Sequence, residues 1–116
     1  MHEQENLSIN EREKEDLIHL FHSFANSTRL NILFVLKNEP LTVTEICEKL
    51  DMTQSAISHQ LRNLKLARLV KNKKVGRKVY YTLKDHHIHD IIDLAIEHVK
   101  EYSDGKQTWH LFTGYL

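Results

Sequence analysis

The sequence has little of what builds disulfide-bonded, membrane-spanning or loop-rich proteins. Its 116 residues include one cysteine, one proline and three glycines. The single Cys47 excludes an internal disulfide and suits a reducing compartment. No apolar run reaches the roughly 20 residues needed to span a bilayer, and the acidic N-terminus does not resemble a signal peptide. We therefore expect a cytoplasmic protein without a membrane segment.

The formal net charge is zero, because Lys and Arg together number 16 and so do Asp and Glu. The two signs are nevertheless separated along the chain. From Met52 to Lys84 there is no acidic residue, and the basic residues of this stretch are Arg62, Lys65, Arg68, Lys71, Lys73, Lys74, Arg77, Lys78 and Lys84. Such separation within a neutral chain predicts a local basic surface for a polyanion.

The N-terminal half predicts three helices. Asn10 followed by Glu13 has the pattern of a capping box at the first helix, and Asn26 or Ser27 begins the second, with Arg29 as its first-turn cation. Thr44 is expected to cap the short third helix. The apolar residues at helical spacing are Leu17, Leu20, Phe21, Phe24, Leu30, Leu33, Leu36, Ile46, Cys47 and Leu50.

A longer helix is expected from Thr53, its cap, to about Ala67. Two helices joined by a short turn, the second opening with small hydrogen-bonding residues, form the helix-turn-helix pattern. The candidates for reading bases or facing a DNA groove are Gln54, Ser55, Ser58 and His59. The candidates for contacting phosphate or the minor groove are Arg62, Lys65, Arg77 and Lys78.

A hairpin is predicted after this helix. Two strands, over 69–73 and 77–83, surround the turn Lys74-Val75-Gly76, where glycine permits the positive φ of a tight turn. Val79 and Tyr81 alternate with polar neighbours, as a half-exposed strand requires. A basic hairpin directly after a helix-turn-helix is a wing.

The last predicted helix, over 85–101, has two separate apolar stripes. At about 100° per residue, one face spans roughly 80° and carries His87, Ile91, Leu94, His98 and Glu101. The other stripe consists of Ile88, Ile92, Ala95, Ile96 and Val99. One stripe can pack on the helix's own domain, which leaves the other free to pack on something else.

The polar groups of the first face suggest a metal site made by two chains. His87 and His98 lie about 16 Å apart along one helix, whereas zinc holds nitrogen ligands at about 2 Å. Asp85 with His87, and His98 with Glu101, can each supply half of a four-ligand set. Two such helices packed antiparallel would then build two identical sites in a two-fold dimer. The competing interpretation is a solvated helix face, which is how we interpret the neighbouring His86 and His89.

These features together resemble the ArsR/SmtB family of metal-sensing repressors, which are dimeric winged-helix proteins that release operator DNA when metal binds. The resemblance runs from about Leu17 to Glu101. It is carried by the stretches 26–33 (NSTRLNIL), 54–61 (QSAISHQL) and 76–81 (GRKVYY), and by the last helix. Asp85, His87, His98 and Glu101 match the pattern of the zinc-sensing branch. Many relatives carry a Cys-x-Cys pair at the position of Thr42-Val43-Thr44, so thiophilic ions are not expected to bind there.

The resemblance and the residues together predict a mostly helical α+β fold. This is a winged helix-turn-helix of about five helices and a two-stranded β-wing, in a homodimer. Residues 1–9 are expected to be a flexible N-terminus, 10–103 the domain with dimerising first and last helices, and 104–116 a tail. The expected partner is double-stranded, palindromic operator DNA, and the expected regulatory ligand is Zn(II), or else Co(II) or Ni(II).

Three other functions compete with this prediction. One is a winged-helix repressor that senses a non-metal signal, with incidental histidines. Another is a nickel or cobalt sensor that recruits His2 or His110 from the termini. The third, a zinc hydrolase, is disfavoured because the sequence has no HExxH motif and four protein ligands would leave no position for water. We therefore expect no enzyme.

Overall fold

The computed structural model describes residues 8–104. Two predicted segments lie mostly outside the described residues. These are residues 1–7 of the predicted flexible N-terminus (1–9) and residues 105–116 of the predicted tail (104–116). His2 and His110 are therefore among the residues not described. The chain divides into two compact units, Met1–Lys84 and Asp85–Leu116.

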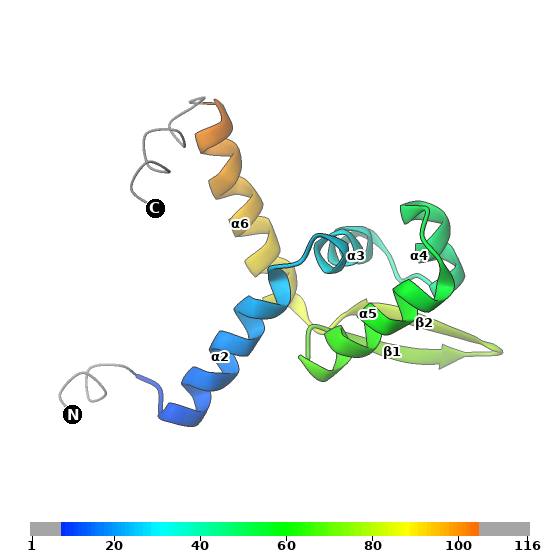
Figure 1. Ribbon diagram of the computed structural model, residues 1–116, viewed down its shortest axis with the longest axis horizontal. Helices are drawn as coiled ribbons and strands as arrows, with labels where there is room; N and C mark the ends of the chain where they lie inside the picture. The colour runs from blue at the N-terminus through cyan, green and yellow to red at the C-terminus, as the bar shows by residue number, and fades with distance from the viewer. Residues whose placement is uncertain (1–7, 105–116) are drawn as a thin grey trace. The chain divides into compact units, whose positions relative to one another are not determined.

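The first unit contains four helices and a hairpin among its described residues. These are α2 (Glu11–Phe24), α3 (Ser27–Asn38), α4 (Val43–Leu50), α5 (Gln54–Leu66), β1 (Val70–Val75) and β2 (Lys78–Leu83). In Figure 1 the α4–α5 pair lies beside the hairpin. The fully buried side chains are Ile32, Leu33, Ile46, Ile57, Leu61, Leu64, Leu69 and Val70. The predicted winged helix-turn-helix is confirmed.

Side-chain caps fix where the first helices begin. The capping box at α2 is present as predicted, since Asn10 Oδ1 accepts from the N–H of Glu13 and Glu13 Oε1 accepts from the N–H of Asn10. Asn26, not Ser27, is the N-cap of α3. Ile32, which the predicted inward set omits, is completely buried there.

The prediction that Thr44 caps α4 is wrong, because Thr42 is the N-cap. Thr42 Oγ1 accepts from the N–H of Glu45 at 3.2 Å, and Glu45 Oε1 accepts from the N–H of Thr42 at 2.8 Å. This reciprocal pair satisfies two amide groups that a helix start otherwise leaves unpaired. The helix ends at Leu50, and the φ of 54° at its C-cap, Asp51, turns the chain towards α5.

Helix α5 is capped by Thr53 as predicted, and it ends in a Schellman motif. The N–H of Leu69 donates to the carbonyl of Leu64 at 2.9 Å, and the N–H of Arg68 donates to the carbonyl of Lys65 at 3.0 Å. Arg68 occupies the left-handed position of this motif with a φ of 64°. Glycine is the usual residue there because it has no Cβ to crowd the carbonyl.

Replacing Arg68 by glycine should therefore stabilise the protein. We expect an Arg68→Gly variant to gain about 0.5–1 kcal/mol in free energy of unfolding, because relief of the left-handed strain exceeds glycine's larger unfolded-state entropy. Urea denaturation of the two proteins measures this gain. Arg68→Ala removes the same charge but keeps a Cβ, so an equal gain in that variant would point to charge and not to backbone strain.

The wing is an antiparallel pair with a shorter turn than predicted. Val70 pairs with Leu83 and Val75 with Lys78, so that only Gly76 and Arg77 connect the strands. Gly76 has a φ of 64° and occupies the first turn position, where type II′ hairpins favour glycine. Leu41 and Tyr81 also exchange two backbone hydrogen bonds, of 3.1 and 2.7 Å. This bridge attaches the wing to the segment just before α4.

The second unit contains helix α6 (His86–Asp104), which runs beyond the predicted end at Glu101. Ile88 and Ile92 of the predicted packing stripe are buried. Ala95 and Val99 of that stripe are exposed, and so is Leu94 on the other face.

Candidate nucleic-acid interface and metal-binding helix

Helix α5 buries one side and leaves the predicted DNA-reading side accessible. Its buried residues are Ile57, Leu61 and Leu64. The exposed candidates on the helix are Gln54, Ser55, His59, Arg62 and Lys65, whereas Ser58 is half-buried. Ser55, His59 and Arg62 follow one another at helical spacing, so they form one continuous exposed stripe.

The charge distribution around α5 favours an anionic partner. The first turn of α5 holds no acidic residue, whereas α2 and α4 carry Glu11, Glu13 and Glu45 in theirs. The N-terminal amides of α5 therefore keep their partial positive charge without a side-chain anion. On the wing, Arg77 and Lys78 are exposed, as are Lys71, Lys73 and Lys74. The structure thus presents the basic stretch of the sequence to solvent along both elements.

The structure brings Asp85 and His87 together at the start of α6. Asp85 Oδ1 caps the helix by accepting from the N–H of His87 at 3.0 Å and from that of Ile88 at 3.3 Å. His87 Nδ1 lies 3.5 Å from the same oxygen, and the His87 side chain is 72% exposed. Desolvation raises the pKa of the Asp85 carboxyl, but the Ile88 amide and the nearby His87 outweigh it and lower this pKa below its ordinary value. Asp85 is therefore an anion near neutral pH.

The second predicted pair lies at the far end of α6. His98 and Glu101 are both exposed, and the His98 ring meets Tyr102 edge-on with centroids 4.8 Å apart. Within residues 8–104, no three His, Cys, Asp or Glu side chains of this one chain lie close enough together to hold a metal ion. The predicted ligand set stays a prediction, since it requires two chains.

The two neighbouring histidines differ from each other. His86 is exposed, as expected, and its ring lies 4.2 Å from that of His87. The His89 side chain is 42% exposed, and its Nδ1 lies 3.2 Å from Asp93 Oδ2 and 3.8 Å from Asp90 Oδ1. His89 is therefore engaged with carboxylates of its own helix.

Comparison with known proteins places these features in a family. Residues 26–72 match the model of the arsR family of bacterial regulatory proteins. The chain is also 40% identical over 92 residues to the HTH-type transcriptional regulator NmtR of Mycobacterium tuberculosis, a match that covers 79% of this chain and 77% of NmtR. This protein belongs to the ArsR family.

Two further transcriptional regulators and one solved structure are also similar to this chain. The transcriptional repressor SmtB homolog of Synechocystis is 34% identical over 87 residues, covering 75% of this chain and 66% of that protein. The transcriptional activator HlyU of Vibrio cholerae is 34% identical over 89 residues, covering 77% and 82%. The solution structure of apo-NmtR superposes with a TM-score of 0.69 at 35% identity, covering 83% of this chain and 81% of that one.

These relatives are transcriptional regulators, so the predicted ArsR/SmtB resemblance is confirmed, and so is the prediction that the protein is not an enzyme. Among residues 8–104, no helix is both long and apolar enough to cross a membrane.

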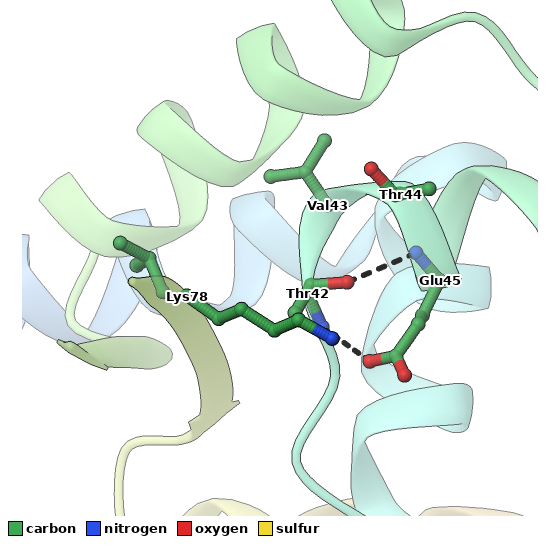
Figure 2. A pocket seen from close by; sticks show the side chains of 6 residues that line it. Thr42, Val43, Thr44, Glu45 and Lys78 are labelled. Carbon is green, nitrogen blue, oxygen red and sulfur yellow. Dashed lines mark hydrogen bonds between the residues drawn. The ribbon is translucent and has the colours of Figure 1, made fainter. Parts of the chain in front are cut away.

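A pocket lies where many ArsR-family members are expected to carry a Cys-x-Cys pair. It measures about 440 Å³ and is lined by Thr42, Val43, Thr44, Glu45, Lys78 and Val79. Figure 2 shows Lys78 of the wing extending towards the capped start of α4. The lining offers hydroxyls, one carboxylate and one ammonium group but no thiolate, and the absence of thiophilic-ion binding here stays a prediction.

The cap in this pocket makes stability depend on acid pH. The Thr42 amide that donates to Glu45, more than the nearby Lys78 and Lys49, lowers the pKa of the Glu45 carboxyl below its ordinary value of 4.5. A lowered folded-state pKa means that the ionised carboxylate stabilises the fold above the unfolded-state pKa. This contribution is lost as the pH falls through the lower, folded-state pKa.

Glu45→Gln should weaken this acid dependence, because glutamine can still cap but does not titrate. We expect the free energy of unfolding to fall less steeply below about pH 4.5 in this variant than in the wild type. Urea denaturation from about pH 7 to about pH 3 measures the two profiles. Glu48→Gln removes a carboxylate from the same helix without touching the cap. If Glu45→Gln and Glu48→Gln gave the same profile, the cap would not be the cause.

Proposed function

We propose that this protein is a metal-responsive transcriptional repressor of the cytoplasm. It binds palindromic operator DNA as a homodimer, and it is released when Zn(II) binds between the two α6 helices. Co(II) and Ni(II) fit the same mixed nitrogen and oxygen donors. The proposal rests on two pairs of candidate ligands, one near each end of α6, with the apolar side chains of Ile91 and Leu94 between them on the same helix face.

The DNA contact follows from α5 and the wing. Gln54, Ser55, Ser58 and His59 supply side chains that can donate to or accept from base edges, and glutamine can pair bidentately with adenine. Arg62, Lys65, Arg77 and Lys78 supply cations for phosphate or the minor groove. Each phosphate that a cation neutralises releases counterions, so operator affinity should fall steeply with added salt.

Dimerisation would cover apolar side chains that a single chain leaves exposed. On α2 these are Leu17, Ile18 and Phe21, and on α6 they are Leu94 and Val99. Leu17, Ile18 and Phe21 lie within about one turn of α2, and such a cluster of exposed apolar residues is typical of an interaction surface. A two-fold partner would also bring together half-sites that lie about 16 Å apart on one helix.

The metal site would use side-chain oxygen and nitrogen atoms of α6 and its N-cap. Asp85 caps α6 through Oδ1, so its Oδ2 remains to bind the ion together with the His87 ring. His98 and Glu101 of the partner subunit would complete two nitrogen and two oxygen donors. An ion held in this way favours one orientation of the two DNA-reading heads. If that orientation fits the operator poorly, metal and DNA oppose each other, and DNA must weaken metal binding by the same factor.

A second candidate function is a regulator of the same fold that senses a non-metal signal. It is favoured by the similarity to HlyU, which is named an activator and not a metal-dependent repressor. In that case the histidines of α6 would be a solvated face. A variant of the metal proposal is a nickel or cobalt sensor that takes additional ligands from His2 or His110. Deleting the terminal segments would abolish the metal response of such a sensor.

Fluorescence anisotropy with a duplex from the protein's own promoter region tests the proposal. At fixed salt, the protein should bind this duplex more tightly than a scrambled one, and zinc should weaken operator binding by about tenfold or more, or roughly 1.4 kcal/mol. Equal binding to both duplexes would contradict a sequence-specific repressor. Specific binding that zinc, cobalt and nickel leave unchanged would favour the second candidate.

A further inference from the structure

Arg29 stands at an unfavourable end of its own helix. It lies in the first turn of α3, where its backbone N–H donates to Asn26 Oδ1 at 2.9 Å. The first turn of a helix carries partial positive charge, so a cation there is disfavoured. An arginine at this place therefore needs a compensating partner elsewhere.

The compensation comes from the preceding helix. Arg29 Nε donates to the carbonyl oxygen of Ser23, in the last turn of α2, at 2.8 Å. The last carbonyls of a helix lack partners within the helix and carry partial negative charge. Ser23 is itself buried, and its Oγ donates to the carbonyl of His19 at 2.9 Å. The guanidinium thus fixes the carbonyl end of α2.

The same guanidinium also reaches the helix that carries the DNA-reading residues. Arg29 Nη1 donates to Gln60 Oε1 on α5 at 3.2 Å, between residues 31 positions apart. Both side chains are half-buried. One side chain therefore connects α2, α3 and α5. A lysine could not replace it, because the guanidinium holds its N–H donors in fixed directions and an ammonium group does not.

Gln60 lies at a place on α5 from which it can set the rotation of that helix. The buried residues Ile57, Leu61 and Leu64 hold one side, and Ser55, His59 and Arg62 are exposed. Gln60 lies between these two sides, on the flank opposite Gln54 and Ser58. At a helix radius of about 5–6 Å, a rotation of 10° displaces a side-chain tip by about 1 Å. Base-edge hydrogen bonds do not tolerate such an error.

We propose that Arg29 is a positioning residue that ties the carbonyl end of α2 to the flank of α5, so that the dimer formed through α2 sets how α5 enters the DNA groove. This inference rests on the proposed function, because it assigns α2 to the dimer and α5 to the DNA. Arg29 itself touches neither DNA nor metal in this account. It acts on sequence specificity and not on general affinity for polyanions.

Three variants test the proposal by operator binding at a protein concentration that keeps the dimer intact. Arg29→Lys keeps the charge but loses the two-armed bridge, and Gln60→Met keeps the length but loses the acceptor. Each should weaken operator binding by about tenfold while leaving the affinity for a scrambled duplex unchanged. The double variant should lose no more than either single variant, because both remove the same bridge. Arg12→Lys, on the exposed start of α2, is the matched control and should bind as the wild type does.

Other outcomes would overturn the inference. The inference is wrong if Arg29→Lys keeps the wild-type ratio of operator affinity to scrambled-duplex affinity. It is also wrong if the loss of operator affinity in the double variant equals the product of the two single losses. A loss that is equal on both duplexes would mean a general charge or stability effect instead of positioning.

A measurement without DNA separates this inference from the proposed function. In the NMR spectrum of the free protein, the Arg29 Nε–H should exchange more slowly with water than that of Arg12, and Gln60→Met should shift its resonance. Exchange as fast as in Arg12 would show that the bridge is absent and would overturn the inference alone. A wild type that does not prefer its operator would overturn the proposed function, and the positioning role with it, even if the bridge is seen.

Discussion

Zinc should lose its effect on operator binding when His98 is replaced by alanine. In the wild type we expect zinc to weaken binding by about tenfold or more, or roughly 1.4 kcal/mol. His98→Ala should bind the operator with wild-type affinity in the absence of metal, because His98 lies on α6 and not on α5 or the wing. It should ignore zinc, because each interhelical site would keep only three of its four protein ligands and lose one of its two nitrogens. Fluorescence anisotropy at fixed salt, with and without zinc, measures all four affinities.

His86→Ala is the matched control for this experiment. It removes an exposed histidine from the first turn of the same helix, beside His87 but outside the predicted ligand set. Its operator affinity should still respond to zinc as the wild type does. A zinc response that survives in His98→Ala, or that disappears equally in His86→Ala, would contradict the predicted ligands.

Leu64→Ala should lower the free energy of unfolding by about 3 kcal/mol. Leu64 is completely buried on α5, and its carbonyl accepts the closing hydrogen bond of the Schellman motif from Leu69. Truncation to alanine removes apolar burial and leaves a cavity in a close-packed core. Urea denaturation monitored by circular dichroism measures this difference in the free energy of unfolding. The two proteins are compared at the same dimer concentration and under conditions where unfolding is two-state.

Leu66→Ala provides the control on the same helix. Leu66 is 74% exposed, two residues beyond Leu64, so its truncation creates no cavity. We expect a change within about 0.5 kcal/mol, since exposed substitutions away from caps and cores have small effects. Equal losses in the two variants would mean that helix propensity, and not burial, governs stability here.

Local chemistry made much of the fold predictable from the sequence. Asn10 with Glu13 and Thr53 at α5 act through residues three positions away, so a short stretch is enough to identify them. Gly76 marks the wing turn for the same reason. The start of α4 is also encoded locally, since Thr42 and Glu45 have capping-box spacing. Thr44 fits the simpler pattern of a capping threonine as well, so the choice between the two depends on the reciprocal bond from Glu45.

The features that the sequence did not predict depend on residues far apart in the chain. The Leu41–Tyr81 bridge and the Arg29–Gln60 hydrogen bond join separate elements, and no periodic pattern in a short window reports them. Arg68 in a left-handed conformation was missed because arginine gives no signal for it. The candidate DNA-reading residues could be named because α5 is a regular helix, so one buried stripe fixes the exposed one. The candidate metal ligands could be paired by their spacing alone, whereas a site that combines the two pairs would need a second chain.

Zinc binding to a mixed dimer tests the central claim most directly. One protomer would carry Asp85→Ala and His87→Ala, and the other His98→Ala and Glu101→Ala, with different tags so that the heterodimer can be purified. Each homodimer then lacks half of both sites, whereas the heterodimer keeps one complete site, made by the intact ends of the two α6 helices. We predict tight binding of one zinc per heterodimer and none by either homodimer. Tight zinc binding by either homodimer, or a well-formed heterodimer that binds none, would contradict a metal site shared between the two protomers.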